Sequence, residues 1–227
     1  EIKRQETADA TKKPSIVPAR DDAGAGYVTA AGTHYGQYIN LDGDDSKDNY
    51  QLIMQYRGVG MHPEVDAAIE DIVNEAIVGS ETAQSVDVSM DDLKVSDSIK
   101  KQIKEEFDNI YAMLDFGTYG HDIFRRWYTD GRIYHHLVVD EKNLKAGIQE
   151  IRAIDSSKMR KVKQVKKKKD QETGAQIIEK VDEYYIYQEK PGSAQQGGVK
   201  MSLDSVSYVT SGLLDESRRK VLSYLHK

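Results

Sequence analysis

The run from His121 to Asp140 joins a helical pattern to a strand pattern across one glycine. Before Gly131, large apolar side chains recur four residues apart, as Ile123 and Trp127 do, and this spacing places them on one face of a helix. After Gly131, apolar and β-branched residues predominate, which is typical of a strand. A chain with such a junction must fold so that a helix packs directly against a sheet.

Helical patterns dominate the first half of the chain and strand patterns dominate the second. The expected helices cover about 46–57, 63–78, 97–115 (capped by Ser96) and 120–130, with a closing helix from Asp215. The expected strands cover about 85–89, 131–139, 147–154, 160–167 and 176–187, with a short strand pair around 199–210. The predicted fold class is α+β, with helices packed on a small, mostly antiparallel sheet and a long charged β-hairpin.

Two domains are expected. Residues 1–45 mix charge with Gly, Ala and Thr and show no helical period, which indicates an extended N-terminal arm that a neighbour could order. Residues 46–227 form the α+β domain. Within that domain, residues 189–198 are expected to form a loop or flexible insertion.

Charge is distributed unevenly along the chain. The formal net charge is -6, but residues 40–120 carry 18 acidic and 6 basic residues, whereas residues 121–227 carry 15 acidic and 21 basic residues. Opposite fields of this kind suit head-to-tail contact between copies of one chain. Two solvated faces of a monomer would give the same totals.

The motifs of common enzymes and metal sites are absent from the sequence. The chain has no cysteine, no GxxxxGK[ST] phosphate loop, no GxSxG and no HExxH. The Asp-rich run at 42–48 lacks the glycine and glutamate that a calcium loop requires at its sixth and twelfth positions. We therefore expect no enzyme activity, no cofactor and no metal.

His135 and His136 are adjacent in an expected strand. Adjacent strand residues point to opposite faces of the sheet, so the two rings cannot readily share a metal. Partly buried, hydrogen-bonded histidines are the favoured interpretation, ahead of a catalytic role.

Lys158–Lys169 contains eight Lys or Arg residues in twelve positions. Such a run can bind phosphate backbones, which makes Lys163, Lys166, Lys167 and Lys168 candidates for a weak DNA contact. Lysines on an exposed hairpin also protect a sheet edge against aggregation, and acids on the later strand can offset their charge. A nucleic-acid-binding module is therefore the alternative function.

Arg125 and Arg126 lie within the aromatic helix and carry no adjacent nucleophile or base. We expect them to project to opposite flanks and to pair with acids of residues 64–75, of which Glu70 and Asp71 are the candidates. These pairs would be structural or would join one subunit to the next.

Several segments, in one order, resemble a known family. They are YRGVGMHPEVDAAIEDIVNEAIV (56–78), HDIFRRWYTDGRIYHHLVVD (121–140), GIQEIRAIDSSKMRKV (147–162), DEYYIYQEK (182–190) and SGLLDESRRKVLSYLHK (211–227). They resemble the portal, or head-to-tail connector, proteins of T-even-type contractile-tailed phages, with an N-terminal part similar to cyanophage members. The likeness covers roughly residues 46–227.

The resemblance implies a structural subunit of a dodecameric ring at one vertex of the phage head. Such rings serve DNA packaging, DNA passage and head–tail joining, so the implied partners are other copies, the major capsid protein, terminase, neck and tail proteins, and double-stranded DNA. The implied location is the virion, with the host cytoplasm during assembly and no membrane span. The present residues resemble the outer wing, while the stem, clip and channel regions of the family have no counterpart here.

Overall fold

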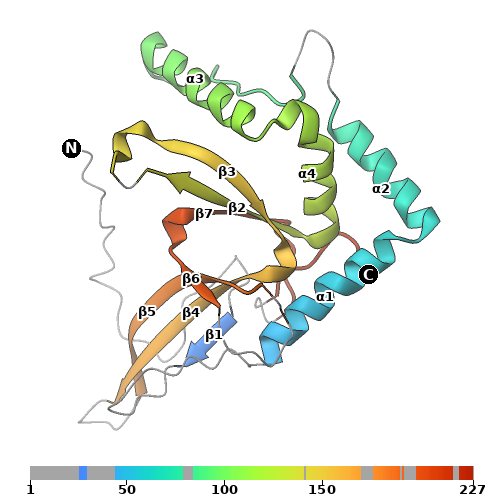
Figure 1. Ribbon diagram of the computed structural model, residues 1–227, viewed down its shortest axis with the longest axis vertical. Helices are drawn as coiled ribbons and strands as arrows, with labels where there is room; N and C mark the ends of the chain where they lie inside the picture. The colour runs from blue at the N-terminus through green and yellow to red at the C-terminus, as the bar shows by residue number, and fades with distance from the viewer. Residues whose placement is uncertain are drawn as a thin grey trace.

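The computed structural model describes residues 26–29, 44–78, 84–140, 142–169, 176–189, 191, 198–216 and 220–226. Helices come first along the chain and most strands follow, so the predicted α+β class is confirmed. Figure 1 shows the helices along one side of the molecule and the strands on the other. Most of the expected N-terminal arm, and residues 190 and 192–197 of the expected loop, lie outside the described residues.

The described part of the chain contains four α-helices. They are α1 (Asp44–Gly60), α2 (Pro63–Ala76), α3 (Asp97–Met113) and α4 (Phe116–Asp130). Pro63 occupies the first turn of α2, where a missing amide proton costs nothing. Ser96 precedes α3 as expected, but its side chain makes no capping hydrogen bond. No described helix is long and apolar enough to cross a membrane.

The described strands form two sheets. The first has the order β3-β2-β7 and is antiparallel, with β2 (Arg132–Val139) between β3 (Ile148–Ile154) and β7 (Val206–Thr210). The second has the order β1-β4-β5-β6, built from β1 (Gly26–Thr29), β4 (Met159–Lys169), β5 (Gln176–Tyr187) and β6 (Val199–Met201). β4 and β5 are the long hairpin predicted from the sequence, and β1 is the parallel neighbour of β4. Short 3-10 turns, η1 (Leu144–Ala146), η2 (Ser156–Lys158) and η3 (Leu203–Ser205), join some of the strands.

The two sheets share one aromatic core. Tyr134 of β2 is 1% exposed and stacks on Tyr208 of β7, with ring centroids 4.5 Å apart. Tyr185 of the hairpin packs edge-on against Tyr134 at 6.0 Å, and Met159 and Val206 complete the buried cluster. Edge-on and offset aromatic pairs are favourable beyond the area they bury. This core fixes the base of the hairpin against the first sheet.

The expected strand at 85–89 does not form. Val86 and Val88 alternate as in a strand, but no described strand pairs with them. The Asp87 side chain instead accepts hydrogen bonds from the Val88 amide and from Lys104 of α3. A strand requires a partner for its backbone groups, and here side-chain bonds hold the segment against a helix.

The prediction of a closing helix from Asp215 is also wrong. Leu214 and Val221 form an isolated antiparallel bridge, and the Lys220 amide donates to the Asp215 side chain at 2.9 Å. This pairing folds the described part of the segment back on itself. The strand pair expected around 199–210 is wrong in its pairing, because β6 bonds to β5 and β7 bonds to β2.

Candidate functional site: an arginine–aspartate joint

The C-terminal end of α4 is the point where helices, sheet and C-terminal segment meet. Gly131 ends α4 in the left-handed conformation (φ 72°), and a Cβ at this position would lie 2.5 Å from the carbonyl oxygen of Leu222. Its own carbonyl accepts a hydrogen bond from the Ser211 amide at 2.7 Å. Only glycine combines this backbone conformation with so close an approach. The glycine identified in the sequence is therefore required by both the turn and the packing.

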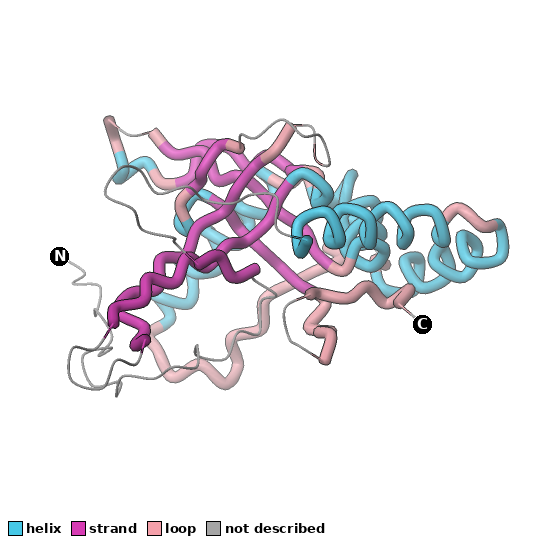
Figure 2. The backbone as a smooth tube through the Cα atoms, turned by 90° about the horizontal axis from the view of Figure 1, so that it is seen from below, coloured by secondary structure: helices cyan, strands magenta, loops and turns pink. Residues whose placement is uncertain are grey.

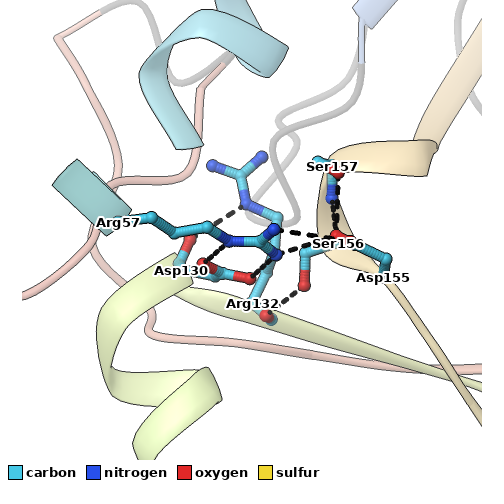
Figure 3. Close-up of polar contacts among 6 residues, drawn as sticks. All are labelled: Arg57, Asp130, Arg132, Asp155, Ser156 and Ser157. Atoms are coloured by element: carbon cyan, nitrogen blue, oxygen red, sulfur yellow. Dashed lines mark hydrogen bonds and ion pairs between the residues drawn. The ribbon is translucent and has the colours of Figure 1, made fainter. Parts of the chain in front are cut away.

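Arg57, in the last turn of α1, binds two aspartates at this junction (Figure 3). Its Nε and Nη2 donate to the two carboxylate oxygens of Asp130 at 2.9 and 2.7 Å. The same Nη2 donates to Asp155 at 2.7 Å, just before η2. Asp130 is almost fully buried, with its side chain 4% exposed. The planar guanidinium suits this two-pronged geometry, so one side chain joins α1, α4 and the turn after β3.

The charges in this group stabilise one another. Hydrogen bonding to Asp130, followed by bonding to Asp155, raises the pKa of Arg57 despite its partial burial. Partial burial opposes ionisation of Asp155, but hydrogen bonds from Arg57 and Ser157 outweigh it and lower the pKa of Asp155 to about 2. Arg57 and Asp155 are therefore ionised at neutral pH. Neither of them is poised to donate or accept a proton there.

Arg132, the first residue of β2, extends the joint to the C-terminal segment. It is 2% exposed, and its guanidinium donates to the Asn49 side chain at 2.6 Å and to the carbonyl oxygen of Val221. The hydroxyl of Ser156 donates to the carbonyl of Arg132 at 2.9 Å. A buried cation with several acceptors is held rigidly, since losing one acceptor would leave it under-satisfied.

A cavity of about 510 Å³ lies beside the joint. Its wall includes Arg57 of the joint, Arg125 and Arg126 of α4, and the imidazole of His135. His135 is 8% exposed, burial lowers its pKa, and its Nε2 has no hydrogen-bond partner in the described structure. The prediction of a hydrogen-bonded histidine is wrong for this nitrogen. Among the residues that the structure describes, no three His, Asp or Glu side chains come close enough to bind a metal.

The four residues predicted to form ion pairs differ in the partners that the structure gives them. Arg125 binds Glu70 at 2.9 Å and also Asp66, which joins α4 to α2 within one chain. Arg126 pairs with Asp122 of its own helix at 2.8 Å, and both side chains are about half exposed. Asp71 is exposed and has no ion-pair partner among the described residues. An intersubunit role for any of them stays a prediction.

The lysines predicted to contact DNA also differ in their environments. Lys163 is 8% exposed, and its ammonium pairs with Glu183 at 3.1 Å, as does that of Lys161. This location does not favour contact between Lys163 and a phosphate backbone. Lys166, Lys167 and Lys168 belong to β4 through their backbones, which pair with β5, and their side chains lie outside the described residues.

The aromatic residues of α4 form a cluster with the C-terminal segment. The rings of Tyr128 and Tyr224 stack with centroids 5.0 Å apart, and Trp127 contacts Tyr224 at 5.4 Å. Phe124 contacts Trp127 at 5.4 Å. These side chains are only half-buried. The cluster stabilises the helix against the chain that follows β7, in keeping with a structural role for this run.

Sequence reasoning missed the central residues of the joint. Arg57, Asp130 and Asp155 are separated by 73 and 25 positions, and no local pattern links residues so far apart. The available signals were an arginine just before Gly58 and an aspartate just before Gly131. Charged residues at helix ends beside glycine are common, so these signals could not identify partners.

Comparisons with known proteins agree on one family. A family model described as bacteriophage T4-like portal protein (Gp20) matches residues 49–227. The portal protein of Vibrio phage KVP40 is 32% identical over 173 residues, which cover 72% of this chain and 33% of that protein. The portal protein of Salmonella phage ViI is 31% identical over 175 residues, covering 76% of this chain and 31% of that protein. The chain thus spans about a third of the length of these curated relatives.

Proposed function

Because this chain belongs to the family of bacteriophage T4-like portal proteins, we propose that it forms the wing-like part of a structural subunit in a dodecameric portal ring. One observation carries the proposal. The family match begins inside α1 and continues through the C-terminal segment, so it covers the helical layer and almost all of both sheets. A match over a whole folded body supports a shared role better than a match to one motif would.

The joint at Arg57 supports a mechanical rather than a chemical role. Arg57 and its two carboxylates are engaged with one another, and the left-handed glycine of the joint is packed against the C-terminal segment. Such an arrangement resists relative movement of helices and sheet. A ring that must bear load while DNA passes through its centre needs blocks of this kind.

The ring would serve DNA packaging, DNA passage and head–tail joining at one vertex of the phage head. Within it, the residues described here would contact neighbouring subunits and the major capsid protein. Contacts with terminase, neck and tail would mostly use regions that lie outside the matched third of the relatives. The protein would reside in the virion and, during assembly, in the host cytoplasm.

Negative-stain electron microscopy and native mass spectrometry of the full-length gene product test this proposal. The expected result is closed rings with a central hole and a mass of twelve subunits. Dispersed monomers at every concentration, or open filaments without rings, would overturn it. Monomers that bind DNA would instead support the nucleic-acid-binding alternative.

A further inference from the structure

The outward face of α2 is an acidic stripe with no ion-pair partner among the residues that the structure describes. Opposite the buried residues Ile69 and Val73, the helix presents Glu64, Asp71 and Glu75 at intervals of seven and four residues. All three are exposed, and none has an ion-pair partner among the described residues. The other acids of α2, Asp66 and Glu70, are bound by Arg125 and hold the helix in place. The fold therefore holds α2 in place and leaves the carboxylates of Glu64, Asp71 and Glu75 exposed on its surface.

Exposed apolar side chains border this stripe. Ile72 is 39% exposed on α2 itself, Met61 just before the helix is 83% exposed, and Val78 just after it is 64% exposed. A purely solvated helix face would carry polar groups at these positions. Exposed apolar residues rimmed by polar or charged ones mark surfaces that contact other proteins.

The β4–β5 hairpin carries the opposite charge. β4 contains seven Lys or Arg residues and no acid, and β5 contains one lysine and three acids. Lys161 and Lys163 both pair with Glu183. The two strands together therefore keep a positive excess that the hairpin's own acids do not neutralise.

These two surfaces lie at opposite ends of the molecule. In Figures 1 and 2, the hairpin extends to one side of the body and α2 lies at the far side. One chain cannot bring them together, but adjacent copies arranged head to tail can. A repeated contact between two different surfaces of identical copies closes into a ring when the rotation allows it.

We propose that the acidic stripe of α2 (Glu64, Asp71 and Glu75) receives the basic β4 strand of the next copy in the ring. The proposal rests on the proposed function, because it assigns the contact surfaces of that ring. A copy of this chain is favoured over nucleic acid because the chain itself supplies the complementary acidic surface. Opposite charge fixes which face meets which and speeds association.

Charge reversal and restoration in the full-length gene product test the proposal. Asp71→Lys with Glu75→Lys, or Lys166→Glu with Lys168→Glu, should each raise the concentration at which rings half-assemble by about tenfold. Combining all four substitutions should restore assembly toward the wild-type value. Ring content is measured by native mass spectrometry, and circular dichroism checks that each variant is folded.

Matched controls reverse equal numbers of exposed charges elsewhere. They are Asp92→Lys with Glu106→Lys, and Lys142→Glu with Lys145→Glu, and they should leave ring content within about twofold of wild type. If the α2 variant does not fold, Asp71→Asn with Glu75→Gln replaces it, and if the β4 variant does not fold, Lys166→Gln with Lys168→Gln replaces it. Each neutral replacement should weaken assembly less than the reversal.

Each outcome decides between the proposals. Normal rings from both reversal variants would overturn the assigned contact and leave the portal role intact, as would a combined variant that fails to regain assembly. Loss of DNA binding by the β4 variant with normal ring content would assign the hairpin to nucleic acid instead. An absence of rings in the wild-type protein would overturn the portal role itself.

Discussion

Helices α3 and α4 are consecutive and similar in length, yet they differ in how the chain uses them. α4 packs against α1, α2 and β2, and its last residue, Asp130, is buried in the joint. α3 has no buried residue, and Ile99, Ile103 and Ile110 are 46%, 37% and 41% exposed. An apolar stripe thus predicts a helix, while the residues at the helix end decide how firmly that helix is bound to the rest of the chain.

The physical difference lies in the type of ion pair. The Arg57–Asp130 pair is bidentate and largely removed from water. The Lys104–Asp87 pair that ties α3 to the preceding loop involves an aspartate side chain that is 69% exposed. Exposed pairs contribute about 0–1 kcal/mol, whereas removing one partner of a buried pair costs about 3–5 kcal/mol. The comparison therefore predicts a graded series of effects.

Among the ion-pair variants, replacement of Asp130 by alanine should have the largest effect. It leaves Arg57 with only its partly exposed partner, Asp155, so the free energy of unfolding should fall by about 3 kcal/mol. Urea denaturation followed by circular dichroism measures this change. Asp122→Ala, which breaks the exposed pair with Arg126, is the matched control and should cost about 0.5 kcal/mol or less. Equal costs for the two variants would show that the buried ion pair stabilises the fold no more than the exposed one.

Gly131→Ala should destabilise the protein by about 2 kcal/mol, because alanine is strained at positive φ and its Cβ would collide with the Leu222 carbonyl. Gly58→Ala is the contrasting variant. Gly58 lies within α1 with nothing near its Cβ position, so alanine there should stabilise the helix by about 0.5–1 kcal/mol. Thermal melting of both variants distinguishes strain from a general intolerance to substitution.

Asp155 should make the joint sensitive to acid. Its pKa is about 2 in the folded protein, below the ordinary value of 3.8, so the folded state favours the ionised form. The stabilisation is therefore complete above about pH 4 and is lost as the pH falls to about 2. Because the side chain is 39% exposed, Asp155→Asn should cost only about 1 kcal/mol at pH 7. The stability difference between variant and wild type should disappear near pH 2 in urea titrations.

Ile110→Gln on α3 should have the smallest effect, because this side chain is already 41% exposed in the single chain. The expected loss is about 0.5 kcal/mol or less. Ile69→Ala on α2, where the side chain is 2% exposed, should cost about 2–4 kcal/mol. Chemical denaturation of the monomer measures both costs, and a large cost at Ile110 would mean that this face of α3 is buried within the single chain.

Local signals in the sequence predicted the elements well where one residue controls a boundary. Pro63 gave the start of α2, and Gly131 gave the turn from α4 into β2. The same reasoning failed where long-range pairing decides the outcome. Leu214 bridges to Val221, the described residues between them are not helical, and Val86 pairs with no described strand.

The candidate site was the least predictable part. Arg125 and Glu70 were brought together from their charges and helix positions, and the structure places them 2.9 Å apart. Arg57 and Asp155 come from elements whose approach depends on the whole fold, so their pairing is visible only in three dimensions. The family resemblance could be identified from the sequence because it rests on several segments in one order. The family model matches residues 49–227, which contain all of them.

The short connection between β6 and β7 has a mechanical consequence. β6 ends at Met201 in the hairpin sheet, and β7 begins at Val206 in the other sheet, with little more than the turn η3 between them. A connection this short has almost no slack, so a pull on the hairpin is transmitted to the strand beside β2. From β2 the load passes through Gly131 to the end of α4. Tension applied to the hairpin is thus carried through the β6–β7 connection, across the hydrogen bonds between β7 and β2, and through Gly131 to the helices.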